Sequence, residues 1–310
     1  HLLDNPPGEV DIQHNWGNLV ILWHGGDVFS ALCHLAQNSP TVAEGETVSK
    51  GQILGKVGNS GRSPVPHLHM QAQASAEIGA PTRLAEFLHY RLSDGSEGAG
   101  RYVTHGSPSD GDVVERVASD EAVRIAVGLM PGRTWSWRVE AAGRSRDERW
   151  KSVIDSVGER FILDEDSGAR LGIFADEHYN TSLHYAGSRR RLLALFYLGM
   201  PRLPYLKERG AGWEDQPSPE VFLSTPGRWL HELALPFFEL NRLHTESLLQ
   251  PGPATGSFRL VTRLRFDGVP WAGRGLPDRV EILFEPGAGP VALDAFRGEE
   301  PRVKARLVSP

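Results

Sequence analysis

The sequence predicts a mostly β protein in which an antiparallel β-sheet is followed by a second β-rich domain with one or two helices. Three observations support this prediction. A chain of 310 residues is long enough for two domains that each bury a core. Residues 9–74 contain short apolar runs separated by turn residues, which is typical of strands. Beyond residue 112, apolar and polar residues alternate in several segments, as in half-buried strands.

A segment rich in glycine, serine and aspartate divides the chain. Residues 93–111 carry few large apolar side chains, and this composition is typical of a linker or a long loop. We therefore expect a first domain over residues 1–92 and a second domain over residues 112–310.

The expected elements of the first domain follow from its apolar runs. Gly45 and Gly51 flank a connection that lets one strand fold back against another. A modest helix over residues 80–92 (APTRLAEFLHYRL) is expected to close the domain. The expected strands are NLVILWH (18–24), DVFSALCHL (27–35), GQILGKVG (51–58) and HLHMQAQ (67–73).

In the second domain, the alternating segments predict an antiparallel sheet, in a sandwich or a barrel. Two other segments, SRRRLLALFYLGM (188–200) and PGRWLHELALPFFELNRLH (226–244), have the length and apolar spacing of helices. The expected strands include TWSWRVEA (134–141), ARLGIFAD (169–176), FRLVTRLRF (258–266) and RVEILFEP (279–286).

Composition excludes several classes of function. The formal net charge is −6 and charges of both signs are spread along the chain, so no basic stripe is available to neutralise nucleic acid. Cys33 is the only cysteine, which excludes an internal disulfide and a zinc site built on several thiolates. No segment approaches the roughly 18 apolar residues of a membrane span.

The first residues, HLLDNPPGEV, contain neither an initiator methionine nor the pattern of a secretion signal. We expect the chain to be part of a longer protein. Any signal for export or anchoring would then lie outside the sequence given.

His67 and His69 are the most informative pair of residues. On a strand, side chains at i and i+2 point to the same face with Cα atoms about 6.5 to 7 Å apart, so both imidazoles can reach one point. If one ring binds Zn²⁺ at about 2.0 to 2.1 Å, the other can contact a metal-bound water. Two exposed imidazoles on an edge strand are the alternative interpretation.

Four stretches in order place this pair in a wider pattern: GNLVILWHGG (17–26), SALCHL (30–35), GETVSKGQILGKVGNSG (45–61) and PHLHM (66–70). Together, over about residues 14–72, they resemble the lysostaphin-type (LytM-type) family of zinc metallopeptidases, which cut peptidoglycan peptides. The resemblance implies the core of a peptidase domain, of which this chain holds the C-terminal part.

The resemblance also implies roles for three histidines. His69 is expected to be a zinc ligand, His67 to handle the proton of the attacking water, and His34 to stabilise the negative charge on the attacked carbonyl oxygen. The implied cofactor is Zn²⁺ and the implied substrates are peptidoglycan peptides. A periplasmic or cell-surface location and a regulatory protein partner are expected, and the loop at residues 58–61 is expected to form one rim of the groove.

Part of the family pattern is missing. The family supplies two more zinc ligands from an HxxxD motif, and this motif is not found: His1 and Asp4 are separated by two residues instead of three. Either the first motif has been cut away, or the chain is a non-catalytic binding or activating module of the same fold. Retention of all three histidines favours the first alternative, in which this chain alone would be inactive. Leu32 replaces a tyrosine common in the family, and Met70 replaces an aromatic residue.

Other residues of the first domain support weaker alternatives. GETVSKGQILGKV is similar to the turn of lipoyl and biotinyl carrier domains, with Lys50 or Lys56 as the modified residue. His14, His24 and Cys33 are interpreted as structural or exposed.

In the second domain, Asp176, His178 and His184 suggest a metal site, but a turn near Asn180 favours solvated residues. His231 and Glu232 lack the second histidine of an HExxH motif. The function of residues 112–310 is left open: wall binding, partner docking and autoinhibition are the alternatives.

Overall fold

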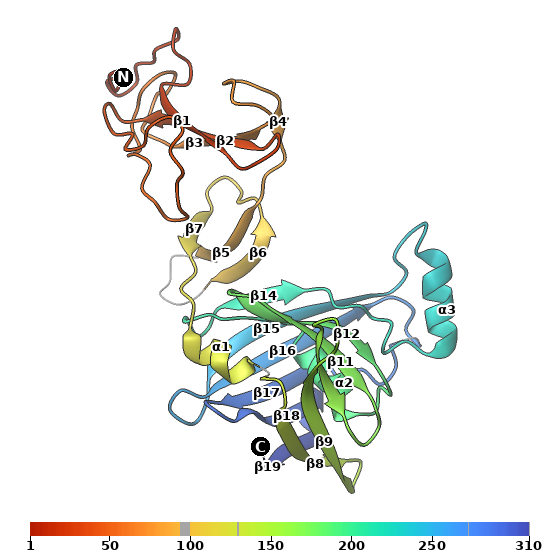
Figure 1. Cartoon of the computed structure of the whole chain (residues 1–310). Coiled ribbons are helices and arrows are strands. Elements are labelled where there is room, and N and C mark those ends of the chain that lie inside the picture. The colour runs from red at the N-terminus through yellow and green to blue at the C-terminus, as the bar shows by residue number, and fades with distance from the viewer. Residues whose placement is uncertain (94–99, 129, 272, 310) are drawn as a thin grey trace. The chain divides into compact units, whose positions relative to one another are not determined.

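The computed structural model describes residues 1–93, 100–128, 130–271 and 273–309, which form two compact units, His1–Phe87 and Leu88–Pro310 (Figure 1). Antiparallel pairing dominates the sheets of both units, and the predicted mostly β fold class is confirmed. No helix in the described ranges is long and apolar enough to cross a membrane.

The first unit contains a four-stranded sheet in the order β1-β2-β3-β4. Its strands are β1 (Asn18–Trp23), β2 (Phe29–Leu35), β3 (His69–Gln73) and β4 (Thr82–Arg83). The central strand β2 pairs with β1 on one side and with β3 on the other. Alternate side chains of β2, from Ala31, Cys33 and Leu35, are buried. This strand therefore supplies much of the small core of the unit.

Two expectations for the first domain are wrong. Residues 51–58 form an irregular loop with one isolated bridge, between Leu35 and Val57. Three glycines interrupt this run, and at Gly58 an added Cβ would lie 2.4 Å from the backbone of Ala36. The loop therefore approaches its neighbour more closely than a regular pair of strands does.

The helix expected over residues 80–92 is also wrong: the segment contains β4 and most of β5 (Phe87–Ser93). Residues of β5 pair with β7 (Val113–Arg116), so the backbone hydrogen bonds are made between strands. Leu84, which would lie on the apolar face of the helix, is 93% exposed. Cross-strand pairing outweighs the local helix propensity here.

The second unit contains a larger sheet, to which fifteen strands of the described residues contribute. Their order is β13-β12-β11-β10-β9-β8-β19-β18-β17-β16-β15-β14-β6-β5-β7. Consecutive strands pair from β8 to β13 and from β15 to β19, and β19 pairs with β8. The remaining strands are β6 (Arg101–Gly106), β8 (Thr134–Ala141), β9 (Arg144–Ile154), β10 (Arg160–Asp164), β11 (Arg170–Ala175), β12 (Tyr179–Ala186), β13 (Arg202–Pro204), β14 (Gly212–Asp215), β15 (Arg242–Pro251), β16 (Phe258–Asp267), β17 (Arg279–Glu285), β18 (Gly289–Arg297) and β19 (Glu300–Ser309).

The four alternating segments of the second domain coincide with β8, β11, β16 and β17. The segment expected to be a linker, residues 93–111, contains strand β6. Residues 94–99 of that segment lie outside the described part. The division between the compact units falls between Phe87 and Leu88, before the expected domain end at residue 92.

Helix α2 (Leu192–Gly199) lies at the centre of the core of the second unit. It packs against β11 and β12 on one side and against β16 and β17 on the other (Figure 1). Seven of its eight residues are buried, because the sheet surrounds the helix and leaves it no polar face. This confirms the helix predicted within residues 188–200.

Buried charges hold the beginning of α2. Glu148 is fully buried, and its Oε2 accepts a hydrogen bond of 3.1 Å from the backbone N–H of Leu192. Arg191 donates from Nε (2.6 Å) and Nη2 (3.0 Å) to the two oxygens of the buried Asp164. Anionic groups near a helix N-terminus are favourable, so this network fixes where the helix starts.

Two further helices are shorter or more exposed. Helix α1 (Glu121–Val127) is capped by Asp120, whose carboxylate accepts from the N–H of Ala122 at 2.8 Å, and sequence patterns did not predict it. Helix α3 (Thr225–Ala234) occupies only the first half of the segment 226–244 expected to be helical, because β15 begins at Arg242.

Replacing Phe196 by alanine should test the importance of the enclosed helix. This side chain is fully buried in α2, so the substitution is expected to lower the free energy of unfolding by about 3 to 5 kcal/mol. Phe237→Ala is a matched control, because Phe237 is 83% exposed and its loss should change stability by less than about 0.5 kcal/mol. Urea unfolding followed by tryptophan fluorescence measures both. Equal losses would contradict the packing described for α2.

Candidate functional site

Three histidines of the first unit meet at the junction of β2 and β3. The ring centroids of His34 and His67 lie 4.8 Å apart, and those of His34 and His69 lie 5.9 Å apart. The register explains part of this, because Cys33 of β2 pairs with His69 of β3. His67 precedes β3, so it reaches the cluster from the loop and not from the strand position predicted for it. The three predicted histidines are therefore brought together, but His67 lies in a loop where the sequence predicted a strand.

His34 is the buried member of the cluster, with 4% of its surface exposed. Its backbone has a φ of 61°, a left-handed conformation that is uncommon for residues other than glycine. Backbone hydrogen bonds hold it there: its N–H donates to Trp16 O (3.1 Å) and its O accepts from Gly58 N–H (3.0 Å). The neighbouring chain thus imposes the conformation that aims this ring.

The ring of His34 is fixed by one further hydrogen bond. Its Nδ1 lies 2.8 Å from the backbone oxygen of Ser60, and since a carbonyl only accepts, Nδ1 carries the proton. Burial lowers the pKa of His34 below its ordinary value, and the neighbouring His67 and His69 lower it further, whereas the Ser60 carbonyl raises it. The neutral ring therefore presents an unprotonated Nε2.

His67 is exposed and is oriented by the turn before it. Its Nδ1 lies 2.9 Å from Val65 O and 3.1 Å from the Oγ of the buried Ser63. The carbonyl again requires a proton on Nδ1, so Nε2 of the neutral ring is free to accept one. Because His67 is exposed, this nitrogen is the proton acceptor of the cluster that a substrate or water can reach most easily.

His69 is held between a tryptophan and a row of amides. Its ring lies edge-on to Trp16 at a centroid distance of 5.2 Å. Its Nε2 lies 3.2 Å from Gln71 Oε1, and Gln71 Nε2 in turn donates to Gln73 Oε1 at 2.7 Å. With Nε2–H donated to Gln71, the neutral ring of His69 keeps its lone pair on Nδ1.

The glycine-containing loop at residues 58–61 supports the cluster through close backbone packing. A Cβ on Gly61 would lie 2.4 Å from the nitrogen of Gly17, and a Cβ on Gly17 would lie 2.3 Å from Ser60 O. Ser60 is fully buried, and its Oγ donates to Leu35 O at 2.7 Å and accepts from Asn18 N–H at 3.0 Å. These contacts place the carbonyl that orients His34.

The N-terminal residues also support this loop. Asp4 Oδ1 accepts from Asn59 N–H at 2.7 Å and its Oδ2 accepts from Gln37 N–H at 3.2 Å. Both oxygens of the carboxylate are therefore used to hold backbone. This agrees with the sequence-based decision not to treat His1 and Asp4 as the missing HxxxD ligands.

The remaining candidates of the first unit are either exposed, as His14 and His24 are, or buried, as Cys33 is. His14 pairs with Asp11 at 2.8 Å, and His24 contacts Ser30 Oγ at 2.9 Å. Cys33 is fully buried, and burial raises the pKa of its thiol to about 11, which keeps it in the less reactive protonated form.

The donor set falls short of a zinc site. Within the described ranges, no group of three or more His, Cys, Asp or Glu side chains is placed to hold a metal ion. Catalytic zinc takes three protein ligands and a water. The three imidazoles as they lie here do not fit that requirement.

The candidates in the second unit do not converge on a metal site either. The Oδ1 of Asp176 accepts from the backbone N–H groups of His178 (2.7 Å) and Tyr179 (2.9 Å), so this carboxylate caps a turn. His178 stacks on His89 at 4.2 Å, whereas the ring of His184 lies against Gly172.

His231 is 2% exposed, and its Nδ1 accepts from the backbone N–H of Asn241 at 3.3 Å. This contact gives the side chain a structural role at the end of α3.

Trp16 is a site residue that sequence reasoning missed, and Ser60 was predicted only as part of the loop at residues 58–61. Trp16 positions both a backbone acceptor for His34 and a ring against His69. One glycine follows each of these residues, Gly17 after Trp16 and Gly61 after Ser60. These two glycines, which allow the two segments to touch, are the signal that could have identified the residues.

Comparison with known proteins places the cluster in a family segment. Residues 7–80 match the family model described as Peptidase family M23, which confirms the resemblance noted from the sequence for this part of the chain. A similar curated protein is the DD-carboxypeptidase/endopeptidase Mpg of Neisseria meningitidis serogroup B (strain ATCC BAA-335 / MC58), 37% identical over 70 residues. The match covers 23% of this chain and 16% of that relative. No solved structure matches the chain.

Substitution of Gly61 should test the packing of the loop. Gly61 and Gly45 have similar φ values, 78° and 81°, so alanine is strained at both positions by about 1 to 2 kcal/mol. A Cβ meets nothing within 4 Å at Gly45 but collides with backbone at Gly61. Gly61→Ala should therefore cost about 1 to 3 kcal/mol more than Gly45→Ala. Thermal unfolding of the two variants measures the difference, and equal losses would refute the close approach.

The lowered pKa of His34 predicts a pH dependence of stability. Below the ordinary value of 6.5 the unfolded ring binds a proton while the folded ring stays neutral, so the unfolded state binds more protons. The stability contributed by His34 is then complete above that value and is lost as the pH falls through the lower folded pKa. Chemical unfolding between about pH 5 and 8 measures this slope.

His34→Asn should flatten that slope, because asparagine tolerates the left-handed backbone and does not titrate in this range. His24→Asn is the control, since His24 is exposed, and it should leave the slope unchanged. An unaltered slope in His34→Asn would show that another group titrates.

Proposed function

We propose that the first unit, whose residues 7–80 match Peptidase family M23, is a peptidase domain that acts on peptidoglycan peptides. The convergence of His34, His67 and His69 within that segment supports this proposal most directly. In His34 and His67 a backbone carbonyl holds the proton on Nδ1. The three neighbouring imidazoles can thus provide the groups that transfer protons when a peptide bond is hydrolysed.

The hydrogen bonds suggest how two of the rings divide this work. His67 can accept a proton at Nε2, because its Nδ1–H is donated to Val65. His34 can donate from Nε2 only as imidazolium, because the neutral form keeps its proton on Nδ1. A charged donor aimed at an oxygen that gains negative charge is a strong stabiliser. Because burial lowers the pKa of His34, the free site disfavours this form, and His34 is proposed to reach it only when negative charge develops beside the ring.

The proposal keeps zinc as the cofactor and His69 as one of its ligands, on the basis of the family resemblance. His69 alone cannot hold a catalytic zinc ion, which takes three protein ligands. The described residues do not complete such a set, so further ligands would be required. The location that accompanies this function is periplasmic or at the cell surface, where peptidoglycan lies, and a regulatory protein partner stays a prediction.

The incomplete donor set favours one alternative function. A unit with this fold and without a complete metal site would serve as a cell-wall binding or hydrolase-activating module. In that case the histidines would contribute contacts to a ligand and not to catalysis.

Substitution of single histidines in the complete protein distinguishes the two functions. His69→Ala is expected to lose both bound zinc and the release of peptides from purified peptidoglycan. His67→Ala is expected to lose about 10² to 10⁴ in rate while keeping most of the zinc. Zinc is measured by elemental analysis and cleavage by chromatography of the soluble products.

His24→Ala is the matched control, because His24 is an exposed histidine of the same unit and should change neither quantity. Equal loss of zinc in His67→Ala and His69→Ala would contradict the assigned roles. A protein that binds no zinc, and whose activity is unchanged in His69→Ala, would favour the non-catalytic module.

A further inference from the structure

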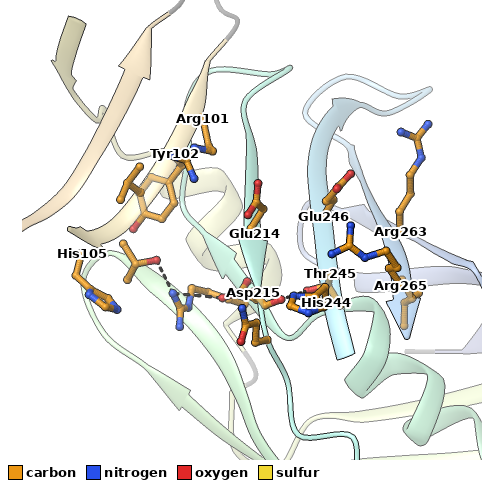
Figure 2. Close-up of a pocket in the computed structure, with 15 residues that line it drawn as sticks. Arg101, Tyr102, His105, Glu214, Asp215, His244, Thr245, Glu246, Arg263 and Arg265 are labelled. Carbon is orange, nitrogen blue, oxygen red and sulfur yellow. Dashed lines mark hydrogen bonds and ion pairs between the residues drawn. The ribbon is translucent and has the colours of Figure 1, made fainter. Parts of the chain in front are cut away.

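The second unit contains a polar pocket of about 550 Å³, formed where β6 approaches β14, β15 and β16 (Figure 2). This volume lies in the range of pockets that hold small molecules, about 300 to 1,000 Å³. Strand β6 forms one wall and pairs with β14 at Gly212 and Arg101. The pocket lies entirely within the second unit, whereas the histidine cluster belongs to the first unit.

The floor of the pocket contains an ion pair with unused hydrogen-bonding capacity. Arg202 Nη1 lies 3.3 Å from Asp215 Oδ1 and also donates to Thr104 Oγ1. The Asp215 side chain is only 9% exposed, yet its Oδ2 has no hydrogen-bond partner, and neither has Arg202 Nε. Buried polar atoms are rarely left unpaired, and these two have almost no accessible surface, so the pair leaves charge uncompensated beneath the pocket.

The state of Asp215 agrees with this interpretation. Burial raises the pKa of this carboxyl to about 6, although Arg202 and a hydrogen bond from Trp213 act in the opposite direction. The carboxylate thus lacks part of the positive charge and hydrogen bonding that would stabilise its ionised form. A cationic group entering the pocket would supply it.

The rim of the pocket presents charges of both signs. Glu214, Glu246 and Arg263 form a cross-strand row on β14, β15 and β16, and Figure 2 shows them on the same side of these strands. Arg101 faces the pocket from β6. These four side chains are exposed, and none has an ion-pair partner among the described residues. The rim therefore offers two carboxylates and two guanidinium groups to a ligand.

We propose that this pocket binds a short zwitterionic peptide. The ammonium group of the ligand is placed against Glu214 and Glu246 and above Asp215. Its carboxylate is placed against Arg263, which is the cross-strand neighbour of Glu246 and whose planar guanidinium group can bind a carboxylate through two hydrogen bonds.

The mixed charge of the lining disfavours two other ligand classes. A phosphate or another multiply charged anion would be attracted by the arginines but would also lie against three carboxylates, from Glu214, Asp215 and Glu246. A divalent cation would be repelled by the four arginines that line the same pocket. A ligand with separated positive and negative groups satisfies both sets, because like charges brought together in a pocket are costly.

The inference goes beyond the proposed peptidase function and does not depend on it. Binding is measured without cleavage, and mass spectrometry of the recovered peptide shows whether it is intact. Loss of peptidase activity in a histidine variant would leave the pocket unaffected, and failure of the pocket to bind peptide would leave the histidine cluster unaffected.

Calorimetric titration of the full chain with alanyl-alanine tests the proposal. The unmodified dipeptide is expected to bind with a Kd in the millimolar range or tighter. Acetylating its amino group or amidating its carboxylate should weaken binding about ten- to a hundredfold each, because each removes a charged partner. Tighter binding of the D,D form would support cell-wall peptides as the source, and tighter binding of the L,L form would support peptides from proteins. Equal binding of the capped and uncapped forms, or no binding of the uncapped forms, would overturn the proposal.

Variants of exposed rim residues assign the two ends of the peptide. Glu246→Gln should weaken binding of the unmodified dipeptide but not of its acetylated form, which has no ammonium group. Arg263→Gln should weaken binding of the unmodified dipeptide but not of its amidated form. Arg259→Gln is the matched control, because Arg259 lies on the same strand outside the pocket and should change neither affinity. Thermal unfolding checks that each variant is folded, and a uniform effect of all three variants would contradict the assignment.

Discussion

The hydrogen bond between His34 Nδ1 and the backbone oxygen of Ser60 is the contact on which the candidate site depends. It sets which nitrogen of the ring carries the proton, and it joins the end of β2 to the loop that precedes His67. The carbonyl is in place only because Gly17 and Gly61 allow two backbone segments to touch. Geometry at the site is thus decided by main-chain packing, and the imidazoles follow from it.

Much of the fold could be predicted where one physical signal dominated. Strand β8 alternates apolar and polar residues over its whole length, β16 and β17 do so over part of theirs, and α2 is apolar enough to be recognised as a helix. Prediction failed for residues 51–58 and 80–92. Their local composition favoured a strand and a helix, respectively, but contacts with segments distant in the sequence determined the structure. Strand β5 is the clearest case, since its partner β7 begins twenty residues later, at Val113.

The candidate site was predicted in part for similar reasons. The three histidines were found from motif order, and their convergence follows the prediction, although His67 lies before the strand and not on it. Trp16 and the charges of the polar pocket were not found. Arg101, Asp215 and Arg263 are far apart in the sequence and carry no shared motif, so only the sheet order reveals that they line one pocket.

The enclosure of α2 has a consequence for how the protein is made. The helix needs β16 and β17 to cover one side, and the sheet is completed only when the last strand, β19, pairs with β8. A ribosome therefore releases a fully apolar segment well before the strands that bury it exist. Such an interval of exposure favours aggregation of the nascent chain until β19 has been made and can pair with β8.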